Sequence, residues 1–83
     1  MLKNIEKEII ILFDLNKKYV FNENRMFKII NFFIKTKYSS IKDNFIIKIS
    51  NIDKNTKEFD FLIKYKKITK TFKIVVKRES YMN

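Results

Sequence analysis

Hydrophobic and polar residues follow two different periodicities along this chain, and the change occurs near residue 44. Between Glu23 and Tyr38 the apolar residues recur at spacings of three and four, which predicts an amphipathic helix with Asn22 as its N-cap. Ile29 and Phe32 widen the apolar stripe of this segment. We therefore expect other parts of the protein to cover most of the helix surface.

The first segment, about residues 4–18, fits two structures. Ile5, Ile9, Leu12 and Phe13 fall on one helical face, and acidic residues near the start are typical of a helix N-terminus. The apolar run 9–13 is also typical of a buried strand, and Ile11 lies off the helical stripe. This segment is thus a helix or, alternatively, a fourth strand.

From residue 45 onward the hydrophobic positions alternate with period two, which predicts three β-strands. The residues predicted to share the core face are Phe45, Ile47 and Ile49, then Phe59, Phe61, Ile63 and Tyr65, and then Phe72, Ile74 and Val76. In the first hairpin, one consistent register sets Ile47 opposite Phe61 and Lys48 opposite Asp60.

For the second hairpin we expect a tight turn at residues 66–69. This turn predicts the core-face pairs Ile63–Phe72, Phe61–Ile74 and Phe59–Val76, and the outer pairs Glu58–Lys77 and Leu62–Lys73. The predicted fold class is α+β, with one or two helices packed on a three-stranded antiparallel β-meander. Residues 1–83 are expected to form a single small domain.

Composition removes most enzymatic chemistry from consideration. The chain has no His, Cys, Gly or Pro. Without His or Cys there is no imidazole base, thiol nucleophile or zinc finger, and without Gly there is no P-loop or dinucleotide fingerprint. We predict no enzymatic activity, no catalytic residues and no cofactor.

Charge is the feature that points to a partner. There are 19 Lys or Arg residues against 9 Asp or Glu, a formal net charge of +10. Residues 61–78 contain no acid. The predicted nucleic-acid-binding residues are Lys48, Lys64, Lys66, Lys67, Lys70, Lys73, Lys77 and Arg78. We expect Lys48, Lys64, Lys66, Lys73 and Lys77 on the outer face of the sheet and Lys67 and Lys70 at or beside the turn.

A second interpretation of the same lysines involves no ligand. Lysines on an open sheet face maintain solubility and oppose edge-to-edge pairing. Ile, Lys, Asn and Phe dominate the sequence, as AT-rich codons favour, so codon usage alone accounts for part of the Lys excess. Only Arg25 and Arg78 offer the bidentate contacts that read guanine, so any nucleic-acid binding is expected to follow the backbone rather than the bases.

Ile46, Leu62 and Val75 are predicted on the outer face, among the lysines. If the first segment is a helix, it could cover them in a three-layer arrangement. Otherwise they form an apolar and basic patch suited to a host protein or a second copy of the chain. Two open sheet edges would also allow homodimerisation by strand addition.

The acidic residues Asp53, Glu58 and Asp60 have the spacing of a weak metal site. Cross-strand pairing with Lys77 and Lys48 is the favoured interpretation, so no metal site is predicted.

The functional hypothesis is a small basic, non-enzymatic protein that binds nucleic acid or a nucleoprotein complex. The alternatives are a phage or mobile-element module that binds and inhibits a host complex, and a subunit of a large assembly such as an organellar ribosome. The first eight residues carry acids, unlike a signal peptide, and no run of about 20 apolar residues occurs. We expect a cytoplasmic or organelle-matrix protein without membrane association.

A helix followed by a three-stranded meander with a basic surface resembles the first four elements of the double-stranded RNA-binding domain. That family's second helix, with its Lys-rich start, has no counterpart in the sequence. Charge, length and element content are also similar to those of small ribosome-dependent RNase toxins, whose motif residues have no counterpart here. The sequence is assigned to neither family.

Overall fold

A computed structural model describes residues 2–78, and its helices precede a sheet, as the α+β prediction requires. In chain order the elements are the 3-10 helix η1 (Leu2–Asn4), α1 (Ile5–Leu15), the 3-10 helix η2 (Lys17–Tyr19), α2 (Glu23–Lys37), the 3-10 helix η3 (Ser39–Asn44), β1 (Phe45–Asp53), β2 (Thr56–Tyr65) and β3 (Ile68–Lys77).

The N-terminal segment is the helix α1, and the alternative of a fourth strand is wrong. Ile5, Ile9 and Phe13 lie one above another at a spacing of four and are fully buried. Ile10 and Ile11, in the middle of the apolar run, are exposed. The spacing of Ile5, Ile9 and Phe13 therefore predicts the observed helix, whereas the apolar run 9–13 wrongly indicates a strand.

The helix α2 begins where the sequence predicts. The side chain of Asn22 caps it, because Oδ1 of Asn22 accepts a hydrogen bond from the backbone N–H of Arg25 at 3.1 Å. The prediction that most of α2 is covered is wrong. Phe32 is 72% exposed and Phe27 46%, since the sheet and α1 leave the outer side of α2 without a neighbouring layer.

The three strands form one antiparallel sheet in the order β1-β2-β3, so β1 and β3 are both edges. The predicted register of the first hairpin is confirmed, with Ile47 opposite Phe61 and Lys48 opposite Asp60.

The predicted register of the second hairpin is wrong by two residues. The observed core-face pairs are Phe61–Phe72, Phe59–Ile74, Lys57–Val76 and Ile63–Lys70. Tyr65 pairs with Ile68, so the turn contains only Lys66 and Lys67. A slip of two keeps every side chain on its predicted face, so the alternation of hydrophobic residues cannot detect it. The length of the turn sets the register, and no glycine marks that turn.

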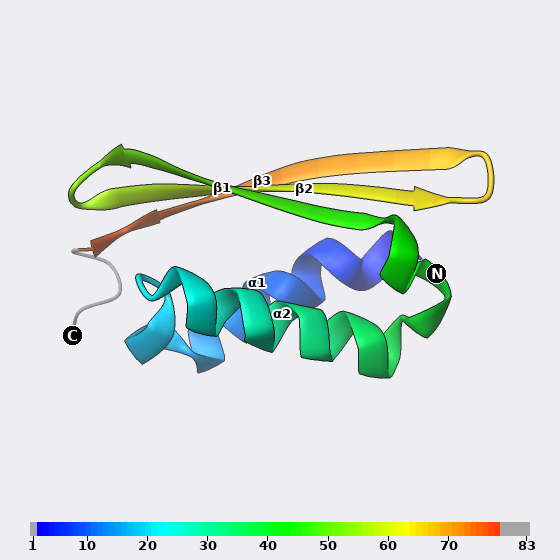
Figure 1. Cartoon of the computed structure of the whole chain (residues 1–83), viewed down its shortest axis with the longest axis horizontal. Helices are drawn as coiled ribbons and strands as arrows, with labels where there is room; N and C mark the ends of the chain where they lie inside the picture. Colours follow the sequence, from blue (N-terminus) through cyan, green and yellow to red (C-terminus); the bar gives the residue numbers. More distant parts are fainter. Residues whose placement is uncertain (1, 79–83) are drawn as a thin grey trace.

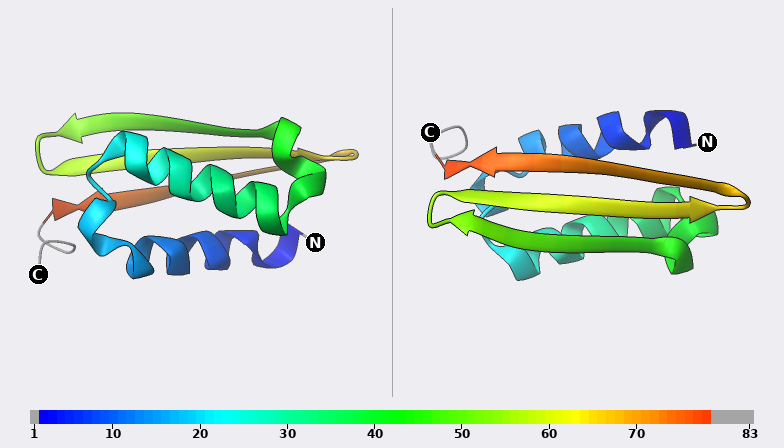
Figure 2. Two further views of the ribbon diagram at one scale, coloured as in Figure 1. Left: turned by 60° about the horizontal axis from the view of Figure 1, so that its bottom comes forward. Right: turned by 90° about the horizontal axis from the view of Figure 1, so that it is seen from above.

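Both helices lie on the same face of the sheet and leave the other face open (Figure 1). Seen perpendicular to the sheet, α1 lies on the β3 side and α2 on the β1 side (Figure 2). The three-layer arrangement is therefore wrong. Between the layers the ring of Phe13 meets Phe59 edge-on, with centroids 4.9 Å apart, and Phe61 stacks on Phe72 at 4.7 Å. These aromatic contacts form the centre of the core.

Candidate nucleic-acid interface

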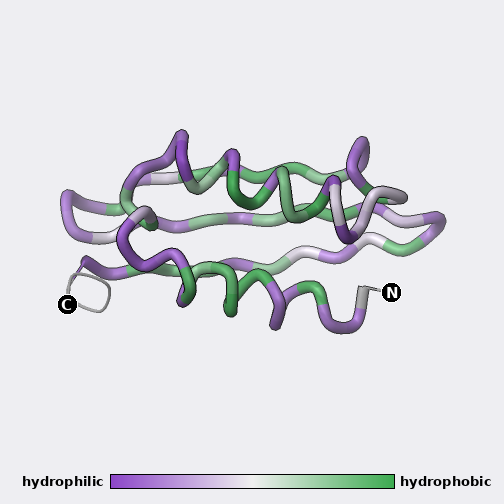
Figure 3. Tube along the Cα trace, turned by 90° about the horizontal axis from the view of Figure 1, so that it is seen from below, coloured by the Kyte–Doolittle hydropathy of each residue, from purple (hydrophilic) through white to green (hydrophobic). Residues whose placement is uncertain are grey.

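The far end of the β2–β3 hairpin extends beyond the helices (Figure 1) and carries four lysines in seven residues. We call Lys64, Lys66, Lys67 and Lys70 the basic tip. The first three are exposed, and Lys70 is half-buried. None of these lysines has an ion pair with any residue in the described range 2–78. The turn itself is hydrophilic in the hydropathy-coloured trace (Figure 3).

One lysine of the basic tip lies further from the turn than the sequence predicts. Lys66 lies in the turn, within the predicted turn at residues 66–69, and has a positive φ of 57°. Lys70 pairs with Ile63 and therefore lies on the helix-facing side of β3, two residues beyond the start of the strand. The Nζ atom of Lys66 lies 5.3 Å from the ring centroid of Tyr65, a contact that fixes this ammonium group near an aromatic face.

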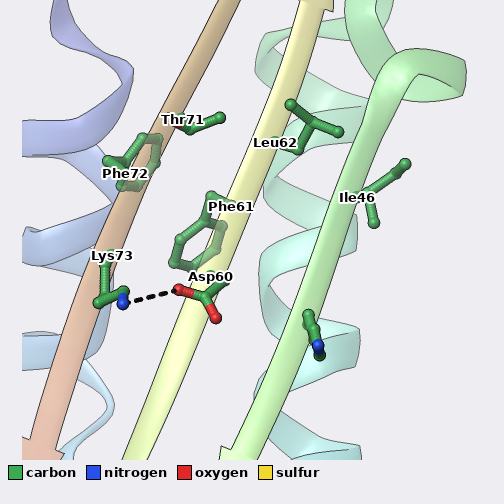
Figure 4. Close-up of a pocket in the computed structure, with 8 residues that line it drawn as sticks. Ile46, Asp60, Phe61, Leu62, Thr71, Phe72 and Lys73 are labelled. Carbon is green, nitrogen blue, oxygen red and sulfur yellow. Dashed lines mark ion pairs between the residues drawn. The ribbon is translucent and has the colours of Figure 1, made fainter.

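Acidic residues neutralise the middle of the outer sheet face. Lys48, Asp60 and Lys73 form one row across the three strands. Nζ of Lys73 forms an ion pair with Glu58 and lies 3.8 Å from Oδ1 of Asp60 (Figure 4). The hydrogen bond with Glu58, together with the charges of both carboxylates, raises the pKa of Lys73. Lys73 is therefore already paired within the protein.

The remaining predicted residues, Lys77 and Arg78, lie at the opposite end of β3. Nine strand steps separate Ile68 from Lys77, which is about 30 Å. The backbone N–H of Arg78 donates to the carbonyl of Asn55 at 2.7 Å. The guanidinium of Arg78 lies 4.4 Å from the ring centroid of Phe21. This end of the molecule cannot share one small contact with the basic tip.

Both arginines stack on aromatic rings of the protein itself. The guanidinium carbon of Arg25 lies 4.1 Å from the ring centroid of Tyr19, and that of Arg78 lies 4.4 Å from the ring centroid of Phe21. Arginine that is committed to such a contact is less available to read base edges.

The structure separates the predicted apolar residues. Ile46 and Leu62 are direct cross-strand neighbours on the outer face (Figure 4). Val75 pairs with Glu58, two rows further along the sheet, beyond the row that contains Lys73. Ile46 and Val75 are exposed, and Leu62 is half-buried. They therefore form a pair and a separate single residue instead of one patch.

The predicted cross-strand pairing is confirmed for Asp60, which lies opposite Lys48, and is wrong for Glu58. Glu58 lies opposite Val75 instead of Lys77, because the second hairpin is shifted by two residues, and both carboxylates interact with Lys73. Oδ1 of Asp53 accepts the backbone N–H of Asn55 at 2.7 Å within the β1–β2 turn. In residues 2–78 no group of three potential ligands has the arrangement of a metal site.

Sequence reasoning missed an apolar surface on the outer side of the helices. Leu15 is 76% exposed, Phe32 72% and Ile11 55%. The signal was present in the sequence, since Ile11 and Leu15 are four residues apart and lie off the buried stripe of α1.

No family model matches this chain, and no curated protein or solved structure shows significant similarity to it. Across residues 2–78, neither α1, α2 nor any shorter helix combines the length and hydropathy needed to cross a bilayer.

Proposed function

We propose that this protein is a non-enzymatic nucleic-acid-binding protein that contacts the phosphate backbone through the basic tip. The observation that carries the proposal is a projecting hairpin end with four lysines and no ion pair to any described residue. Elsewhere on the sheet the charge of Lys73 is balanced by carboxylates. The basic tip is thus the densest group of predicted lysines without an ion pair to a described residue.

The shape of the hairpin is compatible with a duplex. The major groove of B-DNA is about 12 Å wide and admits a two-stranded β-ribbon. Lysine ammonium groups act as point charges toward phosphate and impose little sequence preference. Ile68 is 58% exposed at the same tip and supplies an apolar contact with the groove wall or an unstacked base. The expected binding is directed by the backbone and independent of sequence.

Lys48, Lys77 and Arg78 have a secondary role in this proposal. Lys48 and Lys77 are exposed on the sheet beyond the basic tip. A nucleic acid long enough to lie along the sheet would reach them, whereas a short one would contact the basic tip alone. Length dependence of affinity therefore distinguishes the two modes of contact.

The test is fluorescence anisotropy with labelled random-sequence duplex DNA, duplex RNA and single strands over a range of salt concentrations. Four phosphate contacts predict a slope of log K against log salt of about −3.5 for duplex DNA. The double variant Lys66→Gln/Lys67→Gln should reduce the magnitude of that slope by about 2 and weaken binding roughly 10–100-fold at low salt.

The matched control is Lys17→Gln/Lys18→Gln, which removes the same charge from η2, at the opposite end of the molecule (Figure 1). It should retain the slope of the unmodified protein. Absence of binding at low salt, or equal losses for both double variants, would overturn the proposal. In the second case the affinity would depend on net charge and not on the hairpin.

A further inference from the structure

The outer side of the helical layer carries exposed and half-buried apolar side chains, here called the helical patch. Its members come from both helices, namely Ile11, Leu12 and Leu15 of α1 and Ile29, Phe32 and Phe33 of α2. A groove lies along it, lined by Leu12, Ile29, Phe32 and Phe33 together with Lys28, Thr36 and Lys37. Hydrophobic positions recur along both helices when the layer is seen from this side (Figure 3).

The exposure of these side chains is greater than folding requires. Leu15 and Phe32 retain about three quarters of their surface, 76% and 72%, although the core beneath them is closed. An aromatic side chain presents about 150–250 Å² when fully exposed. The helical patch has six apolar members, two of them aromatic and three half-buried, which together give a few hundred Å², a size that on other monomers often marks a binding site.

The size of the helical patch does not suit a second copy of the chain. A stable dimer buries about 800 Å² on each partner, well above the area that the helical patch offers. Each copy also carries a net charge of +10, so a face-to-face pair would be opposed by repulsion. A single helix is narrower, and it buries apolar residues at i, i+3, i+4 and i+7 in such a groove.

The polar residues of the groove define the charge of its occupant. Lys28, Thr36 and Lys37 line it, and none of the lining residues is acidic. Lys37 is paired with Glu8, whereas Lys28 has no ion pair with any described residue. On the α1 side, Lys7 and Asp14 are both exposed, and their charges cancel. The groove therefore favours an occupant with carboxylates beside its apolar stripe.

We infer that the helical patch binds an amphipathic, acidic helix of another protein. Phe32 and Leu15 are the apolar anchors, and Lys28 pairs with a carboxylate at the edge of the incoming helix. This surface lies on the helical layer and does not include the basic tip, so the two sites can be occupied together. The chain would then connect a nucleic acid to a protein partner.

Three synthetic peptides of about 18 residues, long enough to form helix, test this inference with the 83-residue chain. The first has leucines at i, i+3, i+4 and i+7 with glutamates elsewhere, the second has lysines in place of the glutamates, and the third is a scrambled form of the first. Fluorescence anisotropy should show micromolar binding of the first peptide and at least tenfold weaker binding of the others.

Two variants of one residue type locate the binding surface. Phe32→Ala should weaken binding of the glutamate peptide at least tenfold, as the loss of a central aromatic anchor does. Phe27→Ala removes an exposed phenylalanine from the other side of α2 and should leave the affinity unchanged. Lys28→Glu should reverse the preference between the glutamate and lysine peptides. Circular dichroism of each variant verifies that the fold is intact.

Equal affinity for the glutamate and scrambled peptides, or equal losses in the two phenylalanine variants, would overturn the inference. A dimer in sedimentation velocity that Phe32→Ala dissociates would also overturn it, because the occupant would then be a second copy. The variant Lys66→Gln/Lys67→Gln should bind the glutamate peptide normally. If nucleic-acid binding fails while peptide binding is retained, the proposed function is overturned and the inference about the helical patch is not.

Discussion

The phenol of Tyr38 donates a hydrogen bond to Oε1 of Glu8 at 2.9 Å and so joins the end of α2 to α1. The other carboxylate oxygen of Glu8, Oε2, lies 2.9 Å from Nζ of Lys37. The hydrogen bond from Lys37 lowers the pKa of Glu8, although partial burial opposes the shift. Burial and the neighbouring carboxylate raise the pKa of Tyr38 to about 12. These three residues make the helix pair sensitive to pH at both extremes.

At acidic pH we expect Glu8 to contribute to unfolding. Its pKa is lower in the folded protein, so its stabilising effect is complete above the ordinary value of 4.5 and is lost as the pH falls through the folded value. Urea unfolding of Glu8→Gln should show a weaker dependence of stability on acidic pH than the unmodified protein. Glu6→Gln is the control, because it also removes a carboxylate from the first turn of α1 but no ion pair within the described chain. Equal pH profiles for the two variants would contradict this role of Glu8.

At alkaline pH the prediction concerns Tyr38. Its folded pKa lies above the ordinary value near 10, so the neutral phenol stabilises the fold below pH 10 and that stability is lost between pH 10 and 12. Tyr38→Phe should remove this alkaline loss and reduce the free energy of unfolding at neutral pH by about 1 kcal/mol, the typical net value of one hydrogen bond. Unfolding monitored by circular dichroism at several pH values measures both effects. An unchanged alkaline limb in Tyr38→Phe would contradict the prediction.

The turn of the second hairpin gives a prediction from backbone geometry. Lys66 has a φ of 57°, a conformation that costs a residue with a Cβ atom about 1–2 kcal/mol and costs glycine almost nothing. Lys66→Gly should therefore raise the free energy of unfolding by about 0.5–1 kcal/mol after the entropy of glycine is subtracted. Lys67→Gly is the matched control, because it removes the same charge at a position without positive φ, and it should not stabilise the protein. Denaturant titration distinguishes the two, and stabilisation by both would point to charge repulsion instead.

The two hairpins show how far the sequence alone specifies this fold. The faces of the strands follow from alternation, which places each apolar side chain on one side of the sheet, and the observed Ile47–Phe61 pair is one register compatible with it. The second register does not follow, because shifts of two residues are equivalent on that criterion. The number of residues in the turn decides between them, and of the two turn residues it is Lys66 that has the positive φ. The predicted pairing of Glu58 with Lys77 is wrong for the same reason.

The sequence predicts that the candidate site is positively charged, but it does not predict which lysines remain unpaired or which apolar residues are exposed. An acid-free span of sequence suggested one basic surface, but Glu58 and Asp60 on the adjacent strand bring their charges to Lys73. The lysines nearest the turn have no ion pair with a described residue, since β2 has no acid beyond Asp60. The exposure of Leu15 and Phe32 depends on where the two helices rest on the sheet, which periodicity within each helix does not determine.

Two phenylalanines with opposite environments provide a test of the core. Phe13 is fully buried and contacts the rings of Phe59 and Phe61, so Phe13→Ala should lower the free energy of unfolding by about 3–5 kcal/mol. That loss is a large part of the roughly 4–12 kcal/mol expected for a chain of 83 residues. Phe32→Ala, at an exposed position, should change stability by less than about 0.5 kcal/mol. Urea unfolding measures both, and similar losses in the two variants would mean that Phe32 supports the fold.

The contact between Phe13 and Phe59 also has a consequence for synthesis. The buried stripe of α1 packs on β2, a strand that the ribosome makes only after α2 and β1. Until β2 emerges, Ile5, Ile9 and Phe13 have no sheet to cover them, so the nascent α1 presents an apolar stripe that chaperones recognise. The hairpins, whose strands are neighbours in the chain, can form as soon as they emerge. The helix α1, although translated before the whole sheet, is therefore among the last elements to reach its final position.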